Sequence, residues 1–232
     1  MTIFKNIFYI TLIVLSTTLF AHALTDKSIN IIKSTKNIQY LSQKISKDYL
    51  YIYYNPKKTA TKTELNNSIK KLEESLRIVA KNTHNLDTKN ILDFLSYGKD
   101  QIKELLNSDI SKQNSILILE YSETIFEGAQ SILNTNNYDY TTDKDIKTNL
   151  MRILKSYMAI HTKINKDANI AQLEREKILL KKRMKFLNSE VNQSWQPLEK
   201  FLETKDNYFI PDIVSILVKN IEDITQEHDR NN

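Results

Sequence analysis

The sequence predicts an all-α protein made of tandem antiparallel repeats, each similar to a four-helix bundle. The 232 residues include only two Gly and three Pro, whereas globular chains carry about 7% Gly and 5% Pro. Strand-rich folds need tight turns with residues that tolerate positive φ, so this composition disfavours them. Hydrophobic residues make up 41% of the chain, and they recur at steps of three and four, as on a helix face that packs in a bundle.

The first 23 residues have the features of a secretory signal peptide. Lys5 precedes an apolar run at residues 7–20, and Ala21-His22-Ala23 forms a small-x-small cleavage site. The run is shorter than the roughly 20 residues that a spanning helix needs. We therefore expect cleavage before Leu24 and export of the mature chain to the periplasm. Retention as an inner-membrane anchor is the alternative.

The first repeat is expected over residues 24–134. Its first helix, from about residue 26 to 54, should end at Asn55-Pro56, because proline disfavours helical geometry in the residue before it. Thr63 and Asp87 are candidate starts for the next two helices. The apolar stripes of the three later helices run over residues 65–79, 91–105 and 118–132.

The second repeat is expected over residues 141–232. The polar stretch 134–145 lacks helical periodicity and is the expected joint between the repeats. Pro197 and Pro211 fit first helical turns, where the missing N–H is harmless. The apolar stripes of the second repeat run over residues 146–164, 173–191 and 210–224.

Gly98 occupies an apolar-stripe position inside a predicted helix. Glycine at such a position costs up to about 1 kcal/mol relative to alanine. Two interpretations remain open: a neighbouring helix approaches closely there, or the glycine is simply tolerated.

A short pattern in the first predicted helix returns in weaker form 108 residues later. Such a long internal period suggests that the two halves share an architecture. The aligned pairs are Lys44 and Arg152, Lys47 and Lys155, and Tyr49 and Tyr157.

The first copy, Leu-Ser-Gln-Lys-Ile-Ser-Lys-Asp-Tyr-Leu at residues 41–50, resembles the signature of PilJ-type sensory domains. These form the N-terminal domains of type IV pilus methyl-accepting chemotaxis transducers and are related to the helical domain of nitrate/nitrite sensor kinases. Phe209-Ile210-Pro211 is similar to the step that introduces the last helix in exported stand-alone members with two repeats. The resemblance implies a helical sensory domain that binds a small anion or another small molecule, can pair as a homodimer, and acts through a membrane receptor or transducer.

The resemblance also implies which residues would bind the ligand. The family pattern has arginines early in the motif that residues 36–40 of this chain lack, and lysine offers an oxyanion a point charge instead of a planar fork. The resemblance therefore does not extend to nitrate itself. The alternative is a structural or protein-interaction module of the envelope, in which these lysines are solvated. The candidate ligand-binding residues are Gln43, Lys44, Lys47, Arg152 and Lys155.

Composition disfavours several other functions. Without cysteine there is no disulfide, thiolate metal site or cysteine nucleophile. Two glycines cannot build a glycine-rich phosphate loop, and the histidines do not have metal-ligand spacing. The 33 basic residues are mixed with 28 acidic ones, unlike the clustered basic surfaces of nucleic-acid-binding proteins. We therefore expect no enzyme activity, no cofactor and no nucleic-acid partner.

Overall fold

The computed structural model describes residues 2–136, 138, 146–184 and 189–203, with a few positions between 212 and 223. Within these ranges the regular structure is helical and strands are absent, which confirms the all-α prediction. The helices are α1 (Thr2–Tyr54), α2 (Thr59–Asn82), α3 (Leu86–Leu106), α4 (Lys112–Thr135), α5 (Lys147–His161), α6 (Lys166–Met184) and α7 (Ser189–Glu203).

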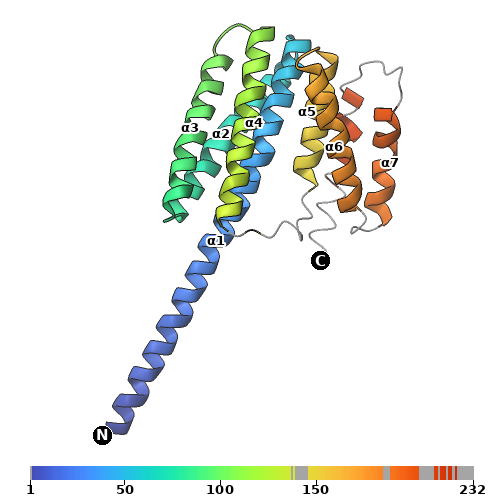
Figure 1. Cartoon of the computed structure of the whole chain (residues 1–232). Helices are drawn as coiled ribbons and strands as arrows, with labels where there is room; N and C mark the ends of the chain where they lie inside the picture. The colour runs from blue at the N-terminus through green and yellow to red at the C-terminus, as the bar shows by residue number, and fades with distance from the viewer. Residues whose placement is uncertain are drawn as a thin grey trace.

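The helices form two neighbouring groups that share α1 (Figure 1). The C-terminal part of α1 packs against α2 and α4, and α3 contacts both α2 and α4, which closes a four-helix bundle. On the other side of α1, α5 packs against α1 and α6, and α6 contacts α7. The N-terminal part of α1 extends away from both groups (Figure 1).

Each group has its own hydrophobic core, but the second core borrows residues from the first four helices. In the four-helix bundle, fully buried residues such as Leu72 and Ile125 come from the predicted apolar stripes. The core of α5, α6 and α7 also contains Leu50 of α1 and Leu119 of α4. The second group is therefore completed by the first.

Several predicted helix boundaries are wrong. Helix α1 begins at Thr2 instead of near residue 26, because the apolar run at residues 7–20 continues the same helix. In the part of the chain that was described well enough to be searched, no helix is long and apolar enough to cross a membrane. Helix α3 is capped by Asn85, not Asp87: the Asn85 side chain accepts a hydrogen bond from the backbone N–H of Thr88.

In the second repeat the predicted helices are broken into shorter ones. Helix α5 ends at His161, because Lys163 and Asn165 both adopt positive φ, at 58° and 43°. The stripe predicted over residues 173–191 belongs to two helices, α6 and α7. Pro197 lies inside α7 instead of in a first turn, because α7 begins at Ser189. Pro211 and six other positions of residues 210–224 lie outside the described residues.

Close helix approach occurs at a glycine, but at Gly128 instead of Gly98. A Cβ added at Gly98 would stand 3.4 Å from the Ile125 side chain, which is an ordinary contact. A Cβ added at Gly128 would stand 2.4 Å from Cδ2 of Leu95, which is fully buried. Of the two interpretations of Gly98, the structure favours simple tolerance.

Candidate functional site

Motif residues from the two repeats meet around one carboxylate, Glu123 of α4. Gln43 of α1 donates a hydrogen bond from Nε2 to Glu123 Oε2 over 3.2 Å. From α5, Lys155 Nζ donates to the same oxygen over 2.9 Å, and Arg152 Nη1 pairs with Glu123 Oε1 at 3.0 Å. Three of the five candidate ligand-binding residues are therefore close together, across the boundary between the repeats.

The network continues into α6. Arg152 Nε donates to Glu176 Oε1 over 2.6 Å, and Lys155 Nζ donates to Gln172 Oε1 over 2.9 Å. The Arg152 guanidinium also lies 4.1 Å from the ring centroid of Phe126, in a cation–π contact. Helices α1, α4, α5 and α6 are thus tied together by one chain of polar contacts. We call this set the interhelix network: Gln43, Glu123, Arg152, Lys155, Gln172 and Glu176.

Burial and charge act in opposite directions on the network's ionisable groups. Burial alone would raise the pKa of Glu123, but Lys155 and Arg152 reverse this and hold the pKa below its ordinary value. Burial lowers the pKa of Lys155, whose side chain is only 2% exposed, and the attraction of Glu123 does not restore it fully. The network therefore depends on Glu123 remaining ionised.

The other two candidate residues, Lys44 and Lys47, lie elsewhere on α1. Lys44 Nζ is 2.7 Å from Asp48 Oδ2, and Lys47 forms an ion pair with Asp48 Oδ1. Asp48 is fully buried. Burial would lower the pKa of Lys44, but Asp48 outweighs it and leaves the pKa above its ordinary value. We call Lys44, Lys47 and Asp48 the Asp48 clamp.

The positions aligned by the 108-residue period have partly diverged in their surroundings. Tyr49 and Tyr157 are both buried, each 2% exposed. Lys44 and Lys47 pair with Asp48 of their own helix, and Lys44 also pairs with Glu64 of α2, whereas Arg152 and Lys155 pair with carboxylates of α4 and α6. The apolar part of the pattern is conserved between the copies, and the polar part serves different contacts.

Sequence reasoning identified the cations but missed their carboxylates. Glu123 follows the stripe residue Ser122 on α4, and Glu176 interrupts the apolar spacing of α6. An acidic residue beside an apolar stripe was the available signal. Its partner could not be named, because Glu123 is 80 residues from Gln43 and 32 from Lys155.

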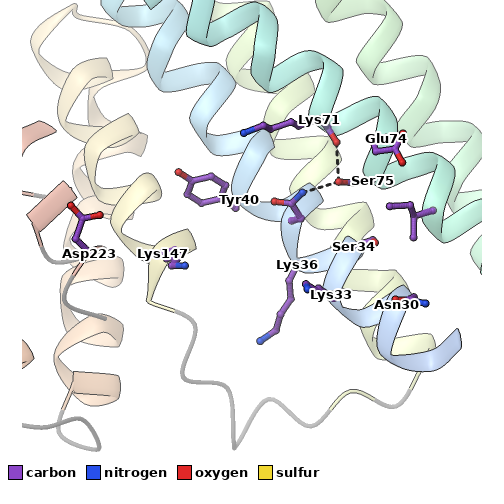
Figure 2. Close-up of a pocket in the computed structure, with 12 residues that line it drawn as sticks. Asn30, Lys33, Ser34, Lys36, Tyr40, Lys71, Glu74, Ser75, Lys147 and Asp223 are labelled. Carbon is purple, nitrogen blue, oxygen red and sulfur yellow. Dashed lines mark hydrogen bonds between the residues drawn. The ribbon is translucent and has the colours of Figure 1, made fainter. Parts of the chain in front are cut away.

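A cleft of about 680 Å³ lies between α1, α2 and the start of α5. Figure 2 shows Lys33 and Lys36 on α1, Lys71 on α2, and Lys147 around it. Tyr40 lies between the two helix groups, and Asp223 of the C-terminal segment is also at the edge. This volume is within the range of small-molecule sites, about 300 to 1,000 Å³. We call it the lysine cleft.

Polar residues of α1 and α2 fix one wall of the lysine cleft. Asn37 Nδ2 donates to Ser75 Oγ over 2.8 Å, and Ser75 Oγ donates to the backbone oxygen of Lys71 over 2.9 Å (Figure 2). Glu74 is bound by Arg77, whose Nη2 lies 2.7 and 2.6 Å from the two carboxylate oxygens. The hydrogen-bonding groups of this wall are therefore largely used within the protein, while the exposed Lys33 and Lys71 also line the cleft.

Comparison with known proteins finds no match: no family model, curated protein or solved structure corresponds to the chain. The similarity to PilJ-type domains thus stays a prediction from the motif. Among the described residues, no three His, Asp or Glu side chains converge as metal ligands would.

Proposed function

We propose that the chain is an exported, helical sensory or ligand-binding accessory protein, which binds a small anionic molecule and acts through a membrane receptor. The lysine cleft is the observation that carries this proposal. It is large enough for a small molecule, and it is lined by cations from three helices. In this proposal the export signal is the segment before Leu24.

The position of the interhelix network supports a sensory function. Helices α1 and α5 contribute Lys36 and Lys147 to the cleft, and the same helices contribute Gln43 and Lys155 to the network. A ligand that displaces α1 relative to α5 would therefore act on buried ion pairs as well. Helical sensors transmit through small shifts of packed helices.

The alternative is a structural or interaction module of the envelope. The observation that favours it is that Arg152 and Lys155 already have carboxylate partners within the chain. An anion could replace these partners only by leaving Glu123 unpaired. In this alternative, the motif residues hold helices together and the chain binds no ligand.

A thermal-shift screen separates the two proposals. The purified full chain is heated with a panel of small anions, including nitrate, nitrite, carboxylates and phosphates. A ligand at about 100 times its Kd adds roughly 2.7 kcal/mol to stability, which raises the melting temperature measurably. If no compound raises the melting temperature, the ligand-binding proposal is rejected and the structural module is favoured.

A further inference from the structure

We propose that the lysine cleft binds a phosphate monoester, with Lys33 and Lys71 as its main cationic contacts. This inference rests on the proposed ligand-binding function and names the chemical class of the ligand. The phosphate group could belong to a soluble metabolite or to a lipid headgroup. The chemistry of the cleft is the same in both cases.

The balance of charge in the cleft favours an anion. Lys33, Lys36, Lys71 and Lys147 line it, against the carboxylates of Glu74 and Asp223. Glu74 is already bound by Arg77. In the described part of the chain, neither Lys33 nor Lys71 forms an ion pair with a carboxylate, and both are exposed. Two ammonium groups from different helices are therefore available to a ligand.

The geometry favours phosphate over a single carboxylate. A phosphate monoester carries nearly two negative charges at neutral pH and three acceptor oxygens. Those oxygens can accept from ammonium groups that approach from several directions, and Lys33 and Lys71 line the cleft from two different helices, α1 and α2. Lysine binds phosphate as a point charge, without the planar fork with which arginine matches a carboxylate.

The rest of the cleft fits a ligand larger than inorganic phosphate. Its volume of about 680 Å³ exceeds what one phosphate group fills. Ile78 and the ring of Tyr40 add apolar surface to the lining. Lys36 lies 4.7 Å from the ring centroid of Tyr138, so an aromatic side chain stands next to the cationic group. These features suit an organic body attached to the phosphate.

The test uses the full chain and a matched control. Binding of glycerol 3-phosphate and of succinate is measured by calorimetry, and binding to vesicles by co-sedimentation. The vesicles contain phosphatidylcholine with or without phosphatidic acid. The cleft variant carries Lys33→Gln and Lys71→Gln. The control carries Lys89→Gln and Lys112→Gln, which remove the same charge from exposed positions on α3 and α4.

We expect either glycerol 3-phosphate or the phosphatidic acid vesicles to bind. Binding of glycerol 3-phosphate would identify a soluble metabolite as the source of the phosphate group, and binding of the vesicles would identify a lipid headgroup. The cleft variant should bind roughly tenfold more weakly or worse, since charged hydrogen bonds are lost, and the control should bind as the unchanged chain does. Affinity should fall as salt screens the exposed lysines.

Other results overturn the proposal in distinguishable ways. If succinate binds and neither phosphate probe does, the phosphate assignment is wrong but the ligand-binding function stands. If the cleft variant and the control variant bind the phosphate probe equally well, the phosphate-binding site is not the lysine cleft. If no compound of any class binds, both the phosphate assignment and the proposed function are rejected.

Discussion

Lys155 of α5 and Glu123 of α4 form an ion pair that joins the two groups of helices, with 2.9 Å between Nζ and Oε2. The Lys155 side chain is 2% exposed and that of Glu123 is 31% exposed. A lysine so deeply buried is tolerated as a cation only beside a carboxylate. The contact therefore contributes to the attachment of the second group of helices to the first, together with the shared apolar core.

Glu123→Gln should destabilise the protein by about 3 kcal/mol. Removing one partner of a buried ion pair costs about 3 to 5 kcal/mol, and we expect the lower end because Glu123 is partly exposed. The amide keeps the size of the side chain, so the loss reports the charge. Urea denaturation measures it, with Glu120→Gln at an exposed position of α4 as the control. Equal stability of the two variants would contradict the network.

A double-mutant cycle with Lys155→Met isolates the pair itself. Methionine fills similar space without a charge, so the double variant has neither a buried cation nor its carboxylate. We expect it to be more stable than the sum of the two single effects predicts, by about 1 kcal/mol or more. Strict additivity would mean that Lys155 and Glu123 do not interact energetically.

The contribution of Glu123 should depend on pH. Its pKa is lowered in the folded state, so its stabilisation is fully present above the unfolded pKa of about 4.5 and is lost as pH falls through the folded pKa. The difference in unfolding free energy between the unchanged chain and Glu123→Gln should therefore shrink below about pH 4.5. Urea melts of both proteins across this range would check it; a constant difference would argue against an ionised Glu123.

The Asp48 clamp allows a separate prediction about Lys44 and Lys47. Replacing Lys44 and Lys47 together with glutamine leaves a fully buried carboxylate without a cation, which should cost about 3 kcal/mol. Adding Asp48→Asn should restore most of this loss, because the buried charge is then gone. Thermal and urea unfolding measure both steps. If the triple variant is no more stable than the double variant, the lysines do not act through Asp48.

The two glycines should respond oppositely to alanine. Gly98→Ala meets only an ordinary contact with Ile125, so it should stabilise the protein by up to about 1 kcal/mol through helix propensity. Gly128→Ala must displace the buried Leu95, and overpacking costs about 1 to 3 kcal/mol. The melting temperature should be higher for Gly98→Ala than for Gly128→Ala; the reverse order would show that the packing of α3 on α4 differs.

Apolar periodicity predicted the helices because burial repeats with the helix turn. It worked for the four-helix bundle, where each helix buries one face. It was less informative for α5, which is buried almost all round from Thr148 to Ala159, so that Lys155 had no visible polar face to mark it. The polar contacts between side chains could not be predicted for a different reason. Contacts such as that of Gln43 with Glu123 join residues far apart in sequence. The cap at Asn85 was missed because two polar residues, Asn85 and Asp87, compete for that position.

The shared core has a consequence for how the chain unfolds. Leu50 of α1 and Leu119 of α4 complete the core around α5, α6 and α7, so the boundary predicted between the sequence repeats does not separate two independent cores. A cut in the polar stretch between α4 and α5 would expose those leucines on one fragment and leave the other with an open core. We therefore expect the two groups of helices to unfold as a single cooperative unit, although the sequence pattern divides them.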